Sequence, residues 1–297
     1  MIRNYFTKGY ERMDNRTGIV LEGGAMRCIF SAGILDFLLD KGIQIPNMLA
    51  VSAGAYTGMN YISGQRGRCI EAMVEPLQEY QYLGLKTFLK KGTFFDMDYL
   101  FDEVPKGKAP FDFQAFQNFA GRFMTSIVSL EKGEALYLDE FETEERLFRV
   151  CKAANSMPFL AKVSYIDGIP VLDGGMADAI PIEKALEEGW EKIIVVLTRN
   201  AAYRKNEKSG LYMRALNMVY GKYPKFIELV RGRAKRYNDS LETIARLEKE
   251  GRIFVFRPTE LTVENSEHDV ERLKAYYQHG YDTASQRYEE LNRFLAE

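Results

Sequence analysis

The stretch N-M-L-A-V-S-A-G-A, residues 47–55, decides the fold that we expect for this chain. A short apolar run ends at Ser52, small residues surround the serine, and a helical pattern follows it. This order predicts a strand, a sharp turn and the start of a helix, which together would raise the Ser52 hydroxyl above the backbone. Ala50 stands where such a turn normally has glycine, so the stretch taken alone favours an ordinary strand-to-helix turn.

A glycine-containing loop precedes this stretch. Residues 18–22 predict a buried strand, residues 23–27 (G-G-A-M-R) predict a loop, and residues 28–40 predict a helix with an apolar face. Strand, loop, helix, strand and helix, in this order, is the alternation of a parallel α/β sheet. If the two strands are neighbours in that sheet, the loop and Ser52 lie at the same edge of it.

The rest of the chain continues the mixed pattern. We expect a helix at 69–80, a strand pair at 125–129 and 135–138, a helix at 143–154, a hairpin at 162–166 and 169–172, and a helix opened by Pro181. A buried strand at 192–198, long helices broken near Pro224, a last strand at 252–256 and two C-terminal helices follow. A basic cluster on the long helices is interpreted as a solvated helix face, because acidic residues are interspersed, and a patch that attracts anionic headgroups is the alternative. Its members are Arg231, Arg233, Lys235 and Arg236.

Residues 84–123 are rich in phenylalanine, interleaved with lysine and aspartate. Irregular structure whose rings fill the core is the favoured interpretation. The alternative is a cap whose exposed rings contact lipid or line an acyl-chain groove. The two interpretations differ in the direction that the rings face.

Composition and charge narrow the classes of function. The formal net charge of −2 over 297 residues favours no nucleic-acid partner, and no nucleic-acid motif is present. Three widely spaced cysteines are typical of reduced thiols in a cytoplasmic protein. The first 18 residues lack the apolar segment of a signal peptide, and no run approaches the roughly 18 apolar residues of a membrane span. We therefore expect a cytoplasmic protein, and nothing indicates its oligomeric state.

Histidine is scarce. The chain has two histidines, His268 and His279, both near its C-terminal end. This excludes a histidine-rich metal site, and a histidine base would have to come from this pair.

Asp173-Gly174-Gly175 ends the second strand of the predicted hairpin. An acyl-transfer site needs a nucleophile, a base and donors for the developing oxyanion. Ser52, Asp173 and the backbone amides of the glycine loop are candidates for these three parts. Each segment alone has a common structural explanation, such as a turn aspartate or a plain βα loop. Together and in this order they indicate a site.

With these three segments the chain resembles the patatin-like phospholipases. That family has a glycine-rich oxyanion loop, a G-x-S-x-G elbow and a D-G-[AG] motif, matched here by residues 23–28, 50–54 and 173–175. The resemblance covers about residues 18–200, and residues 201–297 look more loosely like a bacterial subgroup. It implies a three-layer α/β/α sandwich around a mainly parallel sheet, and lipid acyl hydrolysis by a Ser–Asp dyad without histidine, metal or organic cofactor.

The resemblance also implies how the chain is divided. We expect an N-terminal extension at 1–17, a catalytic core at 18–200 with residues 84–123 as the candidate cap, and a mostly helical region at 201–297 packed on the core. The substrate would be a phospholipid or another acyl ester, with contact at a membrane surface as an open alternative.

The resemblance implies site residues as well. Ser52 would be the nucleophile and Asp173 the general base. Arg27 would either contact a phosphate or other negative charge, or form a surface salt bridge. The oxyanion hole would be formed by the amides of Gly23, Gly24, Ala25 and Ala53.

Three residues replace glycines of the family pattern: Ala25, Cys28 and Ala50. Alanine keeps its N–H, so the oxyanion hole survives at Ala25 if φ is negative there. Cys28 is expected just inside the helix, where packing space is at stake.

Two other functions remain open. An α/β-hydrolase with a Ser–Asp–His triad fits the chain order of Ser52, Asp173 and a late histidine, either His268 or His279. A catalytically weak lipid- or acyl-binding protein would keep the scaffold, and the three lost glycines motivate this interpretation.

Overall fold

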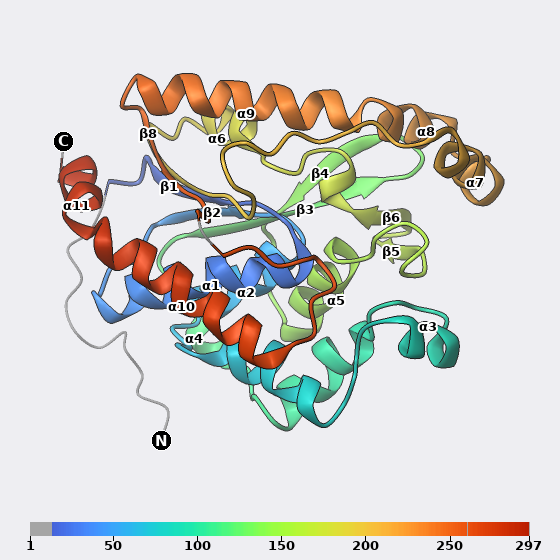
Figure 1. Ribbon diagram of the computed structural model, residues 1–297, viewed down its shortest axis with the longest axis horizontal. Coiled ribbons are helices and arrows are strands. Elements are labelled where there is room, and N and C mark those ends of the chain that lie inside the picture. The colour runs from blue at the N-terminus through green and yellow to red at the C-terminus, as the bar shows by residue number, and fades with distance from the viewer. Residues whose placement is uncertain (1–13, 260, 297) are drawn as a thin grey trace.

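The described residues form an eight-stranded sheet in the order β5-β6-β3-β2-β1-β7-β8, with β4 paired to β3 (Figure 1). The computed structural model describes residues 14–259 and 261–296. The strands are β1 (Thr17–Leu21), β2 (Asn47–Ala50), β3 (Arg122–Ser129), β4 (Glu134–Leu138), β5 (Ser164–Ile166), β6 (Ile169–Asp173), β7 (Lys192–Val196) and β8 (Ile253–Phe256).

The sheet is mainly parallel. Strands β8, β7, β1, β2 and β3 are parallel to their neighbours, and β4, β6 and β5 join in antiparallel pairs. β1 and β2 are neighbours, as the sequence predicts, with Leu21 opposite Ala50. Their residues are almost all buried and apolar, which is typical of parallel strands covered on both faces.

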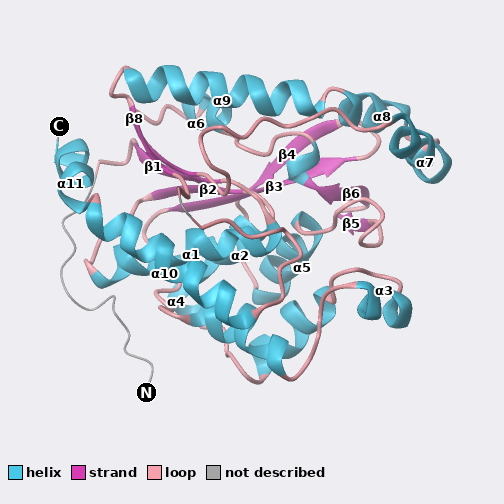
Figure 2. Cartoon of the chain, in the orientation of Figure 1, coloured by secondary structure: helices cyan, strands magenta, loops and turns pink. Residues whose placement is uncertain are grey.

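Helices cover both faces of the sheet (Figures 1 and 2). Successive residues of a strand point to opposite faces, so Ile19 and Leu21 of β1 belong to one apolar cluster and Val20 belongs to another. The first cluster packs against α1 (Cys28–Asp40), α2 (Ala53–Ile62), α5 (Glu144–Ala154) and α10 (Val270–Gln286). The second packs against α6 (Ile182–Glu187) and α9 (Arg233–Lys249). The predicted three-layer α/β/α sandwich is confirmed.

The remaining helices lie around these layers. They are α3 (Leu85–Lys91), α4 (Phe113–Gln117), α7 (Gly210–Tyr220), α8 (Pro224–Arg231) and α11 (Tyr288–Ala296). The helix predicted at 69–80 is instead a π turn at Ile70–Val74 followed by a 3₁₀ turn at Glu75–Gln78. Pro76 explains the change, because it has no N–H to continue an α-helical ladder. None of the helices in the described part of the chain has the length and apolar run that crossing a bilayer requires.

The aromatic segment at 84–123 is mostly core. Tyr99, Phe101, Phe111, Phe116 and Phe123 are buried in the first cluster, as the favoured interpretation states. The large exposed apolar side chains of this segment all lie on α3, where Leu85, Phe88 and Leu89 are open to solvent.

The C-terminal region contributes to the sheet itself. β8 pairs with β7 along Ile193–Val196, beyond the predicted core boundary at residue 200. α10 lies directly on α1, and a Cβ added to Gly280 would lie 2.1 Å from the Phe30 carbonyl oxygen. Residues 1–13 of the predicted N-terminal extension are outside the described part of the chain.

Candidate active site

Ser52 occupies a strained turn between β2 and α2. Its backbone has φ +76° and ψ −126°, an uncommon conformation for a residue with a side chain. α2 begins at the next residue, Ala53, so the serine lies at the positive end of the helix dipole. A Cβ on Gly54 would lie 3.1 Å from two carbonyl oxygens of the β1 end, so glycine lets α2 start close to that strand.

The alanine at position 50 fits this turn. Ala50 is fully buried at the end of β2, and it is not among the residues with positive φ. Because the φ of Ala50 is not positive, alanine adopts this backbone conformation as readily as glycine. The departure from the family pattern therefore leaves the turn intact.

Asp173 ends β6 beside Ser52. The Ser52 Oγ donates a hydrogen bond of 2.6 Å to Asp173 Oδ2, and the Gly175 amide donates one of 2.8 Å to Oδ1. The turn after Asp173 lies hard against β3, because a Cβ on Gly174 would lie 2.2 Å from the Ser126 hydroxyl oxygen. Position 174, directly after Asp173 at the end of β6, therefore has room only for glycine.

The environment of Asp173 shifts its acidity. The carboxyl is 1% exposed, and burial raises its pKa to about 6 against the opposing effects of Ser52, Gly175 and Arg233. A base whose pKa is close to the working pH is well matched to moving a proton. The carboxyl is largely ionised at neutral pH and can accept the serine proton.

Neither histidine joins this pair. His268 is exposed before α10, and its backbone N–H bonds to Glu267. His279 accepts a hydrogen bond of 3.2 Å from the Thr259 amide and packs on Phe30. Within the described residues, no three His, Cys, Asp or Glu side chains are grouped as metal ligands would be.

The glycine loop lies against Ser52. A Cβ on Gly23 would lie 2.8 Å from the Ser52 Cβ, so only glycine permits this approach. The Gly23 amide forms no hydrogen bond with any residue that the structure describes, and the Ala53 amide, as the first of its helix, has no intrahelical partner. Both amides are free to meet a ligand.

Ala25 departs from the expected conformation. Its φ is +50°, in the left-handed region, where the sequence argument required a negative value. An alanine there costs roughly 1–2 kcal/mol, which glycine would not. Cys28 is the first residue of α1, as predicted, and its buried thiol lies 3.5 Å from the Glu22 carbonyl oxygen.

Two cavities of opposite character meet at Ser52. The cationic cavity is bordered by Arg27, Arg199, Lys205 and Arg233. The apolar cavity is bordered mainly by Met26, Met73, Tyr82, Met97 and Leu100. They share Ala25, Ser52, Phe95 and Met157, so an ester at Ser52 has a polar space on one side and an apolar space on the other.

Comparison with known proteins agrees with the segments that build this site. A sequence model of the family described as Patatin-like phospholipase matches residues 19–186, more than half of the chain. The chain belongs to the patatin-like phospholipase family. A second model, Domain of unknown function (DUF6363), matches residues 223–296.

Individual relatives of this patatin-like chain are distant. The Uncharacterized protein YjjU of Escherichia coli (strain K12) is 26% identical over 196 residues, which cover 62% of this chain and 52% of that protein. The match thus spans about half the length of that relative. The crystal structure of VipD from Legionella pneumophila covers 96% of this chain and 70% of that chain, at 14% identity and a TM-score of 0.43.

Sequence reasoning missed residues that hold the patatin-like motifs in place. The Asn155 side chain donates to the Ser52 carbonyl oxygen at 3.2 Å, although its position suggests only the end of a helix. Arg233 donates to the Gly175 carbonyl oxygen at 2.8 Å, and Arg236 donates to the carbonyls of Met176 and Ala177.

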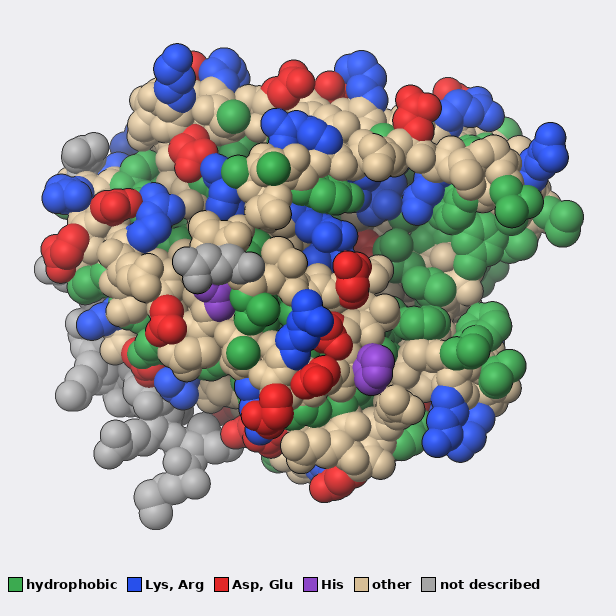
Figure 3. Space-filling model, in the orientation of Figure 1, with side chains coloured by type: hydrophobic (Ala, Val, Ile, Leu, Met, Phe, Trp, Pro, Cys, Tyr) green, Lys and Arg blue, Asp and Glu red, His purple; other side chains and the backbone are tan. Residues whose placement is uncertain are grey.

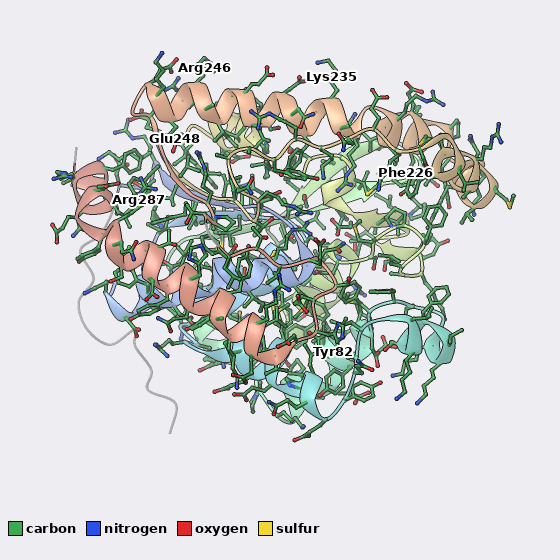
Figure 4. The ribbon with its side chains drawn as sticks, in the orientation of Figure 1. Tyr82, Phe226, Lys235, Arg246, Glu248 and Arg287 are labelled. Carbon is green, nitrogen blue, oxygen red and sulfur yellow. The ribbon has the colours of Figure 1, made fainter. Side chains whose placement is uncertain are left out.

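The solvated-face interpretation of the basic cluster is therefore wrong for half of its members. Arg233 and Arg236 share one face of α9 through their three-residue spacing, and that face packs on the turn after Asp173. Arg231 and Lys235 are exposed and pair with Glu228 and Asp239. Figure 4 shows Lys235 on the outer side of α9, away from the sheet. The three-residue spacing of Arg233 and Arg236, which puts both on one helix face, was the sequence signal that could have indicated this packing.

Proposed function

We propose that this protein is a serine lipolytic acyl hydrolase, a phospholipase or esterase that cleaves lipid esters through a Ser52–Asp173 dyad and an acyl-enzyme. The observation that carries the proposal is the 2.6 Å hydrogen bond from Ser52 to the buried Asp173, placed where the cationic and apolar cavities meet. Membership of the patatin-like phospholipase family agrees with a lipid ester as substrate.

The dyad would work in two half-reactions. Asp173 accepts the Ser52 proton while Oγ attacks the acyl carbonyl carbon, and the protonated Asp173 then gives that proton to the departing alkoxide. A water molecule next gives its proton to Asp173 and attacks the acyl-enzyme carbonyl. Collapse of this second intermediate returns the proton to Ser52 and releases the fatty acid.

The oxyanion would be held by backbone amides. Gly23 and Ala53 offer amides without described partners, and Gly24 and Ala25 lie on the same loop beside Ser52. The positive end of the α2 dipole adds to their field. The strained Ala25 supports the weaker-catalyst alternative, and a fluorophosphonate probe that fails to label Ser52 would favour it.

Arg27 would contact negative charge in the substrate. It borders the cationic cavity with Ser52 and forms no ion pair within the described residues, so the salt-bridge alternative has no partner there.

We also propose that a cytoplasmic form of the protein contacts the membrane surface through one apolar face. Exposed apolar side chains lie on α3 and α7, and two lysines of α3, which form no ion pair with any described residue, complement anionic lipid. Figure 3 shows hydrophobic side chains along the right-hand edge, over these two helices. The residues of this apolar face are Leu85, Phe88, Leu89, Leu211, Met218 and Val219, with Lys86 and Lys90.

The dyad is tested by measuring hydrolysis of a chromogenic ester. We expect Ser52→Ala and Asp173→Asn each to lower kcat/KM by at least 10³-fold, because each removes one half of the proton transfer. The control replaces both histidines, His268→Gln with His279→Gln, and should keep activity within about twofold. Full activity in Asp173→Asn would sink the dyad, and loss of activity in the histidine variant would favour the triad.

A further inference from the structure

We propose that the cationic cavity binds the phosphate of an anionic lipid headgroup, and that Arg199 and Lys205 select such a lipid over a zwitterionic one. The acyl side of this inference rests on the proposed hydrolase function, because the ester must reach Ser52. The ligand chemistry is a phosphate monoester on a single-chain or two-chain lipid.

The cavity holds more positive charge than it can neutralise. Its cations are Arg27, Arg199, Lys205 and Arg233, and no carboxylate lies within ion-pair distance of any of them in the described part of the chain. Its two acids are already engaged. Asp173 is bonded to Ser52, and Glu22 accepts from the Thr198 amide at 2.6 Å and the Tyr237 hydroxyl at 2.7 Å. An anion is the missing component.

The two selecting side chains are held in place before any ligand arrives. The Arg199 guanidinium lies over the Tyr203 ring at 4.5 Å, and the Lys205 ammonium lies over the Tyr237 ring at 4.2 Å. The Lys205 backbone is fixed to α9 in both directions, since its N–H donates to Asn238 at 2.9 Å and its carbonyl accepts from Asn238 at 3.1 Å. A preformed site loses little entropy on binding.

Unsatisfied donors point to the same ligand class. The Nε atoms of Arg27 and Arg199 are buried and have no hydrogen-bond partner within the described residues. Buried donors of this kind are normally satisfied, and phosphate oxygens accept from guanidinium groups in short, charge-assisted bonds.

Lys205 responds to the crowding of charge. Burial, followed by Arg233 and Arg27, lowers its pKa to about 7 against the raising effect of Glu22. A phosphate beside the ammonium would restore its charge, so binding above neutral pH takes up a proton. The lowered pKa of Lys205 agrees with its position in the cationic cavity beside Arg27 and Arg233.

The same features disfavour a choline or ethanolamine headgroup. The headgroup ammonium, quaternary in choline and primary in ethanolamine, needs a carboxylate or an open aromatic face. Here the faces of Tyr203 and Tyr237 are covered by Arg199 and Lys205. The apolar cavity across Ser52 takes the acyl chain, so an anionic amphiphile spans the nucleophile with its phosphate among the cations.

Headgroup preference tests the inference with three substrates of one acyl chain: a monoacylglycerol 3-phosphate, its choline ester and the uncharged monoacylglycerol. The wild type should prefer the phosphate monoester over the choline ester by at least tenfold in kcat/KM. Arg199→Gln and Lys205→Gln should each lose at least tenfold on the phosphate monoester and less than twofold on the uncharged ester. The control Lys235→Gln, on the outer side of α9, should change neither.

An equal loss on charged and uncharged substrates, or an unchanged preference, would overturn the inference. Binding separates this failure from failure of the hydrolase proposal. If the wild type cleaves none of the three esters, glycerol 3-phosphate should still raise the Tm of Ser52→Ala, and Lys205→Gln in that background should abolish the rise. No rise overturns the phosphate site as well. If inorganic phosphate raises the Tm while headgroup preference is absent, the cavity binds free phosphate and the lipid assignment is wrong.

Discussion

Asp173 combines two demands that oppose each other at the level of one residue. To act as a base it must be ionised, and to bond Ser52 without competing water it must be buried. Burial raises its pKa to about 6, which means that the folded protein bears a free-energy cost at neutral pH for keeping this carboxylate charged. Strain adds to that cost at Ser52 and Ala25, whose φ values are +76° and +50°.

We expect Asp173→Asn to stabilise the fold while it removes activity. The folded pKa of about 6 lies above the ordinary 3.8, so the penalty is full above pH 6 and disappears as pH falls below 4. One pKa unit corresponds to about 1.4 kcal/mol, so the gain at pH 8 is on the order of 3 kcal/mol. Urea unfolding of both proteins at pH 8 and pH 4.5 measures it. A difference that does not shrink at the lower pH contradicts the expectation.

Single residues differ in how far the sequence reveals them. Ser52 and Asp173 stand in short motifs with glycines whose necessity is steric, and the sequence carries that pattern openly. Asn155 and Lys205 carry no such pattern, because a polar residue at a helix end or in a loop is common. Their importance comes from contacts across more than thirty residues of chain, such as Asn155 with Ser52. The positive φ of Ala25 also could not be predicted from the sequence, since it depends on how the glycine loop packs against the rest of the fold.

At the scale of elements, α1 and α10 cross with their backbones in contact. A Cβ on Gly33 would lie 2.0 Å from the Tyr277 carbonyl oxygen, and one on Gly280 would lie 2.1 Å from the Phe30 carbonyl oxygen. Each glycine therefore opposes the backbone of the other helix. Because α1 continues directly from the glycine loop at Cys28, this crossing also fixes the loop that faces Ser52.

We expect Gly280→Ala to destabilise the protein by about 2 kcal/mol or more, since an added methyl group in a closed contact forces the helices apart. Activity should fall with it, because α1 carries the loop. Gly210→Ala is the matched control, as a Cβ there meets nothing within 4 Å, and it should be neutral or slightly stabilising. Thermal unfolding of the two variants compares them directly. Equal Tm values would show that the crossing tolerates separation.

Most helices and strands could be predicted from the sequence, because a continuous or periodic run of apolar residues indicates a buried strand or an amphipathic helix. α1 and the hairpin of β5 and β6 follow the pattern closely. Residues 69–80 did not, since Pro76 interrupts an otherwise helical composition. The order of the strands in the sheet also could not be predicted from the apolar pattern. The antiparallel pairing of β6 with β3, which brings Asp173 to Ser52, joins strands some forty residues apart.

Over the whole molecule, apolar exposure is confined. The exposed large apolar side chains in the described part of the chain belong to α3, α7, Tyr80 and Tyr165. Residues 157–160 lie beside both cavities, because Met157 borders both and Leu160 borders the cationic one. The Leu160 carbonyl oxygen accepts from the Phe94 amide, close to α3, and Phe159 packs on Tyr212 of α7. A membrane at this apolar face would therefore lie close to residues that border the cavities.

We expect Leu89→Glu and Met218→Glu each to weaken binding to vesicles containing anionic lipid by at least tenfold. Burying one such side chain contributes about 1.5 kcal/mol or more, and 1.4 kcal/mol is a factor of ten in affinity. Ala245→Glu adds the same charge on α9 and should bind like the wild type. Co-sedimentation with the vesicles measures all three. Unchanged binding in both face variants would remove the membrane role from this surface.

The pairing of β8 with β7 means that the segment matched by the patatin-like family and the cooperative folding unit differ in extent. A fragment cut near residue 222 would retain Ser52 and Asp173 but lose β8, α9 and α10. β7 would then become an edge strand with bare amides and carbonyls, a template for aggregation, and α1 would lose the apolar cover over its outer side. Anyone dividing the chain for expression should therefore keep residues 223–296 attached, because they seal the sheet.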